Sequence, residues 1–192
     1  MLPGGGKRTF SLKRAMSAPG GPDMDAEELR NLQAPLKDRY RESPEAARIT
    51  LTAKGALDDA HIACKVETGR ALAVVAGLHP ATGGSGVELC SGDMLLEALV
   101  ACAGVTLKAV ATALGVPLRS GEVRAEGDLD FRGTLGVDKG APVGFSDTRL
   151  TFALDSDAPQ DQLDTLLKLT ERYCVVLQTL RRSPTVTATI TH

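Results

Sequence analysis

One long apolar segment constrains the fold of this chain more than any other feature. Apolar or small residues recur at helical spacing at six positions, namely Leu95, Leu99, Cys102, Thr106, Val110 and Leu114. Few charges interrupt this segment, so we predict a core helix over residues 93–114, buried on most sides and ended by Gly115 and Pro117. Glu97 and Lys108 break up the apolar run, so we expect no segment long enough to span a membrane.

The sequence on either side of this helix predicts strands and one further helix. Alternating apolar and polar residues favour strands in six segments, which are 47–57, 61–66, 71–76, 121–132, 145–155 and 185–191. The second helix begins near Pro159, has Leu166 and Leu167 among its inward residues, and runs toward Tyr173. Residues 174–180 continue its apolar face after a bend. This order predicts an α+β fold, in which mainly antiparallel sheets pack on two core helices.

The first 44 residues differ in composition from the rest of the chain. Residues 1–24 are rich in Gly, Pro, Ser and basic residues, which predicts a disordered tail. We interpret residues 25–44 as an N-terminal helical extension, with a short polar helix over 25–41 that Pro35 kinks or splits. The globular domain then spans residues 45–192.

Composition excludes several classes of function. The net charge is −2 and only 3% of residues are aromatic, so neither phosphate attraction nor base stacking favours nucleic-acid binding. The chain has four cysteines and lacks a secretory signal pattern, so we expect a cytoplasmic protein with free thiols rather than a disulfide framework. No CxxC pair is present, and we expect neither a metal nor another cofactor.

The cysteines are the residues most able to carry chemistry. Cys102 and Cys174 each fall on a predicted helix, where a free cysteine is commonly a small buried residue. Spacing alone therefore leaves both a structural and a redox interpretation open. We interpret Cys64 and Cys90 as structural, although Cys90 lies near enough in sequence to leave a shuffled disulfide open.

Two segments carry a resemblance to a known family. The sequence ELCSGDMLLEALVAC resembles the first-cysteine helix of the OsmC/Ohr family (osmotically inducible protein C and organic hydroperoxide resistance). Asp93 lies nine residues before Cys102, where many members have Glu, and RYCVVLQTL resembles the second-cysteine motif around Cys174. The Gly83–Gly84 pair and the segment GTLGVDKGAPVGFSD also match, and the likeness runs in order over residues 45–191.

This resemblance implies an OsmC-like fold over residues 45–192, in an intertwined homodimer whose sheets wrap around two core helices. It also implies a thiol-dependent peroxidase. Cys102 would attack a small organic hydroperoxide and become a sulfenic acid, and Cys174 would condense with it to a disulfide. A dithiol or a lipoyl protein would then act as the reductant.

The chain departs from the family pattern at two places. Peroxidase members use an Arg from the early strands, and here Lys65, Arg70, Arg48 and His61 are the candidates for that cation. Without one, the Cys102 thiol would keep an ordinary pKa and react slowly.

The second departure is that Val175 replaces the Pro that usually follows the second cysteine. Asp93 has two open roles, stabilising the start of its helix or holding a cationic partner. The alternative function is a non-catalytic OsmC-like dimer that binds a small hydrophobic ligand in its interface cleft.

Overall fold

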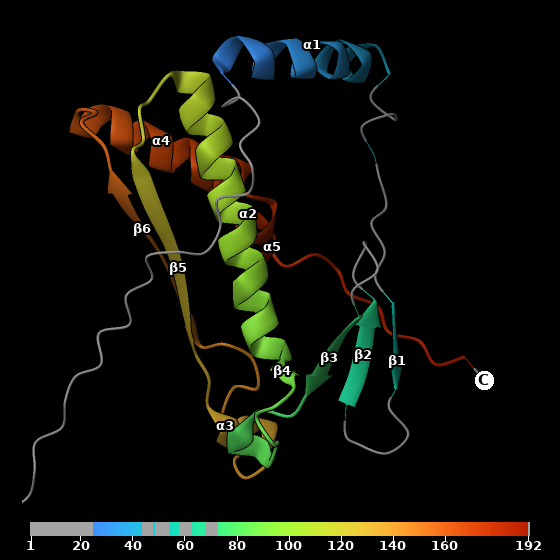
Figure 1. Cartoon of the computed structure of the whole chain (residues 1–192). Coiled ribbons are helices and arrows are strands. Elements are labelled where there is room, and N and C mark those ends of the chain that lie inside the picture. The colour runs from blue at the N-terminus through green and yellow to red at the C-terminus, as the bar shows by residue number, and fades with distance from the viewer. Residues whose placement is uncertain (1–24, 44–47, 49–53, 58–62, 68–72, 192) are drawn as a thin grey trace, which may run out of the picture.

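A long central helix organises the molecule (Figure 1). The computed structural model describes residues 25–43, 48, 54–57, 63–67 and 73–191. Helix α2 (Ser91–Leu114) contains the predicted helix and ends as expected at Gly115, whose φ of 68° gives the left-handed cap that favours glycine. The strands β5 and β6 run along one side of α2, and the first sheet lies beside its N-terminal end.

The first sheet has four strands in the order β1-β2-β3-β4. They are β1 (Lys54–Leu57), β2 (Ala63–Glu67), β3 (Ala73–Gly77) and β4 (Leu89–Cys90). The first three pair antiparallel, whereas β3 and β4 pair parallel, with Gly77 opposite Cys90. A short 3-10 helix, η2 (Pro80–Thr82), lies between β3 and β4. Because β4 leads directly into α2, this sheet fixes where the central helix begins.

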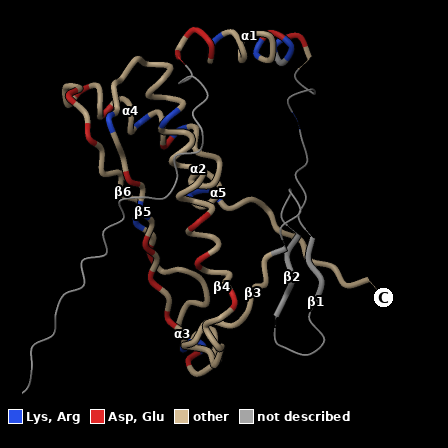
Figure 2. Tube along the Cα trace, in the orientation of Figure 1, with Lys and Arg blue, Asp and Glu red and all other residues tan. Residues whose placement is uncertain are grey.

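The second sheet is a long antiparallel pair. Its strands β5 (Ser120–Asp128) and β6 (Asp147–Asp155) stay in register over their whole length. Acidic and basic residues alternate along this pair in Figure 2. For example, Arg149 lies 2.6 Å from Asp128 and 2.9 Å from Asp147. The predicted strands here are correct in place but too long, because the connecting segment forms a short helix, α3 (Phe131–Thr134).

Two further helices complete the core. Helices α4 (Gln160–Tyr173) and α5 (Val175–Arg181) pack on α2. One cluster joins Leu107, Ala111, Val116 and Leu166. A second cluster joins Leu99, Ala103 and Cys174, with Cys102 and two valines packed against it. Leu166 is fully buried as predicted, whereas Leu167 is 43% exposed and faces a cavity.

Two expectations about the ends of the chain are wrong. Residues 185–191 form no strand, and Val186 and Ile190 are 83% and 91% exposed. Alternation becomes a strand only where a backbone partner is available, and no described strand pairs with this segment. Helix α1 (Ala26–Glu42) continues through Pro35, so the expectation that proline splits this helix is wrong, whereas the kink stays a prediction. Because Asn31 is exposed, water can reach the carbonyl that proline deprives of its partner.

The expectation that α2 is buried on most sides is also wrong. Its buried residues are Leu99, Ala103, Leu107 and Ala111, which form one stripe, whereas Val105 is 73% exposed. Among the described helices, α2 is long and apolar enough to cross a membrane, with a mean hydropathy of 1.8. Glu97 and Lys108 therefore interrupt the apolar run less than we expected, although a core helix of a globular protein passes the same test.

Candidate functional site

Helices α4 and α5 are separated by a single non-helical residue, Cys174. Its backbone is extended, with φ −71° and ψ 107°, and it ends one helix while starting the next. The Cys174 N–H still donates to the Thr170 carbonyl at 3.0 Å, and the Cys174 carbonyl accepts from the Gln178 N–H at 2.9 Å. The bend expected near residue 174 is therefore a break of one residue between two well-formed helices.

Side chains satisfy groups that the break leaves exposed. A helix that ends has carbonyls without partners in its last turn. Here the side-chain amide of Gln178 donates to the Glu171 carbonyl at 2.7 Å, which connects α5 back to α4. The Glu171 carboxylate also accepts from the Arg181 guanidinium at 2.8 Å. These two contacts fix the angle at which α5 leaves the end of α4.

Cys102 on α2 meets the start of α5. Its sulfur accepts hydrogen bonds from the backbone N–H groups of Val175 and Val176, and it also contacts the Cys174 thiol. These are the first N–H groups of α5, which have no partner within their own helix. Thr106 lies one turn further along α2, and its hydroxyl, which donates to the Cys102 carbonyl at 2.7 Å, also lowers the pKa of the Cys102 thiol. The break at Cys174 therefore supplies donors to Cys102.

The surroundings of Cys102 lower the pKa of its thiol. Burial by itself raises the pKa, since a charged sulfur loses water there. The hydrogen bonds from the Val176 N–H, the Cys174 thiol, the Val175 N–H and the Thr106 hydroxyl act in the opposite direction and prevail. Cys102 is therefore the thiol of this pair that more readily forms a thiolate.

Cys174 has the opposite character. It is fully buried, and burial raises the pKa of its thiol. The Leu177 N–H lowers that pKa in part, while the neighbouring Cys102 raises it further, because two negative sulfurs repel each other. The result is a neutral thiol held against a sulfur that tends to be charged. Both cysteines are free, as is Cys90.

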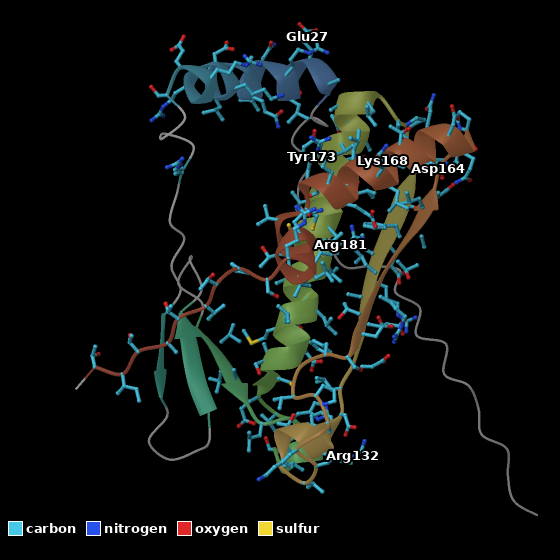
Figure 3. The ribbon with its side chains drawn as sticks, turned by 180° about the vertical axis from the view of Figure 1, so that it is seen from behind. Glu27, Arg132, Asp164, Lys168, Tyr173 and Arg181 are labelled. Carbon is cyan, nitrogen blue, oxygen red and sulfur yellow. The ribbon has the colours of Figure 1, made fainter. Side chains whose placement is uncertain are left out.

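A cavity of about 490 Å³ lies beside this pair, between α2, β6, α4 and α5. Leu99 and Leu177 line it and also belong to the cluster around Cys174, so they connect the cavity to the thiols. The Glu171–Arg181 ion pair lies at its wall. Figure 3 shows Arg181 on α5, close to the end of α4. The volume and lining are typical of sites for small organic molecules.

The structure describes only some of the other predicted site residues. Asp93 is exposed in the first turn of α2 and makes no side-chain hydrogen bond with any residue the structure describes. Of the candidate cations, Arg48 is exposed, and His61 and Arg70 lie outside the described residues, as does the side chain of Lys65. Among the described residues, the groups that lower the pKa of Cys102 are hydrogen-bond donors, and the role of these cations stays a prediction.

Cys90 lies in a different environment, at the start of α2. It lines a second cavity of about 410 Å³ together with His79 and Phe131, whose rings stack at 4.9 Å. The His79 Nδ1 accepts a hydrogen bond from the Ala81 N–H. Leu95 and Phe145 line both cavities, so the two are neighbours. The predicted structural role of Cys90 stays a prediction.

Sequence reasoning missed four participants of the site. The Val175 and Val176 donors are main-chain N–H groups, which no pattern of side chains can reveal. For Thr106 the sequence predicts only a place in the apolar stripe of its helix. Gln178 sits four residues after Cys174, a spacing that could have marked it as a group able to reach back across a helix break.

Comparison with known proteins identifies the family. The model of the family described as OsmC-like protein matches residues 83–189, which is more than half of the chain. The chain belongs to the OsmC-like protein family. No curated protein matches it by sequence. The resemblance seen in the two cysteine motifs is therefore confirmed at the level of the family.

Solved structures show that the fold is the OsmC-like α+β fold. The OsmC-like protein of Mycoplasma pneumoniae is 14% identical, with a TM-score of 0.58 over 70% of this chain and 89% of that one. An organic hydroperoxide resistance protein of Elizabethkingia anophelis is also 14% identical, with a TM-score of 0.55 over 71% and 91%. An organic hydroperoxide resistance protein OsmC of Legionella pneumophila is 15% identical, with a TM-score of 0.54 over 70% and 93%. At such identities the likeness shows the fold alone.

Proposed function

We propose that this OsmC-like chain reduces small organic hydroperoxides with its two central thiols. The observation that carries the proposal is the contact between Cys102, whose pKa is lowered, and Cys174, whose pKa is raised. Since the thiolate is the nucleophile, Cys102 acts as the attacking thiol and Cys174 as the resolving one. Two of the structural relatives are named organic hydroperoxide resistance proteins, which supports this choice of substrate.

The reaction uses both thiols in turn. The Cys102 sulfur attacks one peroxide oxygen, so an S–O bond forms, the O–O bond breaks, and the alkoxide leaves and takes a proton to give the alcohol. The Cys174 thiol then attacks the sulfenic sulfur, which forms a disulfide and releases water. A dithiol or a lipoyl protein supplies the two electrons that restore both thiols. No metal or other cofactor takes part in these steps.

The cavity beside the thiols supports an apolar substrate. Its lining is mostly leucine and phenylalanine, so the organic part of a hydroperoxide would leave water on binding. The same cavity favours the alternative function, in which an OsmC-like dimer binds a small hydrophobic ligand without turnover. The asymmetric thiol pair favours the peroxidase, because a ligand cavity alone needs no such pair.

The proposed working form is a cytoplasmic homodimer. The outer face of α2 is uncovered, with Val105 73% exposed and Ala98 and Ala101 also exposed, so a second copy has an apolar surface to cover. The free thiols at positions 90, 102 and 174 suit a reducing compartment such as the cytoplasm.

The test is peroxide turnover by matched cysteine variants. The unaltered protein should consume cumene hydroperoxide with dithiothreitol and should form a Cys102–Cys174 disulfide, identified by mass spectrometry. Cys102→Ser should lose turnover. Cys174→Ser should still undergo one oxidation at Cys102 and accumulate a sulfenic acid that dimedone traps. Cys90→Ser is the control and should keep full turnover.

Two results would decide against the peroxidase. Unchanged peroxide consumption in Cys102→Ser would show that this thiol does not attack the substrate. Slow alkylation of Cys102 at neutral pH, together with tight binding of small apolar ligands by the unaltered protein, would favour the non-catalytic alternative.

A further inference from the structure

A groove with two arginines lies on the outer side of the junction between α4 and α5. Its volume is about 430 Å³, which is within the range of small-molecule sites. The lining comes from both helices and the segment that follows, namely Arg172, Tyr173, Val175, Gln178, Thr179, Arg182 and Pro184. Figure 3 shows Tyr173 at the end of α4, beside the start of α5. The groove therefore sits directly over the break at Cys174.

The two arginines of this groove differ from the other arginines that follow α2. Arg119, Arg124, Arg132, Arg149 and Arg181 each lie within ion-pair distance of a carboxylate. Arg172 and Arg182 form no ion pair with any residue in the described part of the chain. The Arg172 guanidinium lies over the Tyr173 ring, 5.6 Å from its centroid. Both side chains are exposed, so both charges remain available to an outside anion.

Helix ends explain part of this arrangement but not all of it. Arg172 is in the last turn of α4 and Arg182 caps α5, positions where a cation is favoured. One positive charge at each helix end is enough for this stabilisation of the helix C-terminus. It gives no reason for the two guanidinium groups to line the same groove. Arg181 occupies a similar position on α5, yet it is paired with Glu171. The groove is thus left with two positive charges that are not neutralised.

This groove also lies next to the reactive thiols. The side chain of Val175 lines it, while the N–H of the same residue donates to the Cys102 sulfur. Cys174 stands between Tyr173 and Val175, both of which line the groove. Both observations place the groove beside residues that contact the two thiols.

We infer that this groove receives the anionic group of a small thiol that reduces the Cys102–Cys174 disulfide, an inference that rests on the proposed function. The guanidinium groups hold the anion, and the thiol end reaches toward Val175 and the disulfide. Reduction begins at Cys102, because Cys174 is fully buried and Cys102 is partly exposed.

The exchange takes two thiol molecules, or the two thiols of one dithiol. The first thiolate forms a bond to the Cys102 sulfur, the disulfide bond breaks, and the Cys174 sulfur leaves and takes a proton from water. A second thiolate then attacks the outer sulfur of the mixed disulfide. Its attack releases Cys102 as a thiolate and gives the oxidised small disulfide. Two electrons pass from the thiols to the protein.

A series of small thiols that differ only in charge tests the inference. The probes are 2-mercaptoethanesulfonate, 2-mercaptoethanol and cysteamine, which are anionic, neutral and cationic. Each reduces the oxidised full-length protein, and the disulfide that remains is measured by acid quenching and mass spectrometry. Each rate constant is divided by that of the same thiol with an uncharged small disulfide, which removes differences in intrinsic reactivity.

At low salt, the anionic thiol should react about tenfold faster than the cationic one, the lower end of electrostatic steering effects. In the double variant Arg172→Gln with Arg182→Gln, the three normalised rates should converge. Raising the salt concentration should reduce the preference in the unaltered protein. Arg124→Gln removes one charge from β5, outside the groove, and should keep the preference.

Equal rates for the three thiols would overturn the inference, and so would a preference that survives in the double variant. The rates can be measured whether or not the protein reduces peroxides, because diamide can form the disulfide without any peroxide. If peroxide produced no disulfide, the proposed function would fail while the charge preference could still be measured. Urea unfolding of each variant checks that the fold is kept.

Discussion

Replacing Val175 by proline should remove a hydrogen-bond donor from the Cys102 thiolate without disturbing the fold. Proline lacks an N–H, and the Val175 N–H is one of the donors that lower the Cys102 pKa. Position 175 is the first residue of α5, where proline is well accepted. Cys174 before it is already extended, as the residue before a proline prefers. The Val175 side chain is 71% exposed, so little packing is lost.

The size of the effect follows from the hydrogen bond. A bond to a charged acceptor contributes about 1.5–3 kcal/mol. Because Cys102 is partly exposed, we take the lower end, about 1.5 kcal/mol, which is slightly more than a tenfold change in the ratio of thiolate to thiol. The pKa of Cys102 should rise, since the neutral thiol gains relative to the anion. The pH at which its reactivity appears should move upward accordingly.

The assay is the pH profile of alkylation at Cys102. Iodoacetamide labelling, followed on the Cys102 peptide by mass spectrometry, separates this thiol from the other cysteines. As the pH falls, the labelling rate should drop at a lower pH in the unaltered protein than in Val175→Pro. Val175→Ala is the matched control, because it removes the side chain and keeps the N–H. If both variants gave the same midpoint, the backbone donor would have no part in activating Cys102.

Four further substitutions test the packing around the site, each measured by urea unfolding. The buried Thr170 hydroxyl has no partner among the described residues, so Thr170→Val should raise stability by about 1 kcal/mol, and a loss would reveal a missing partner. Leu166 is fully buried and Leu167 is 43% exposed, so Leu166→Ala should cost about 2–5 kcal/mol and Leu167→Ala clearly less; equal costs would contradict the core assignment. A Cβ at Gly127 would lie 2.6 Å from the Phe145 ring, so Gly127→Ala should cost about 1–3 kcal/mol, and unchanged stability would show that the ring moves aside freely.

Local patterns predicted the elements whose partners lie within the chain. The helical spacing from Leu95 to Leu114 predicted α2. Gly115 predicted its end, because the residue that caps the helix there has a left-handed backbone conformation, which glycine adopts most easily. The alternation in β5 and β6 was also informative, because one face of that pair covers α2. In residues 185–191 the same alternation misled, since it says nothing about whether a partner strand is present.

The candidate site was predictable only in part. Family motifs pointed to Cys102 and Cys174, and the structure brings those two residues together across 72 positions of sequence. The donors to Cys102 could not be predicted, because they are main-chain groups exposed by the backbone angles of Cys174. The expected cation stays a prediction, because most of its candidates lie outside the described residues, whereas the donors that the structure does describe depend on where one helix ends and the next begins.

Oxidation of the two thiols to a disulfide should also change the first turn of α5. No side chain caps this helix, and the Cys102 sulfur accepts its first amide protons instead. A sulfur in a disulfide carries no charge and accepts hydrogen bonds poorly, so oxidation deprives the first turn of its capping group. We therefore expect amide hydrogen exchange at Val175 and Val176 to quicken when the disulfide forms. The rate of amide hydrogen exchange in the first turn of α5 would then report whether the two cysteines are oxidised.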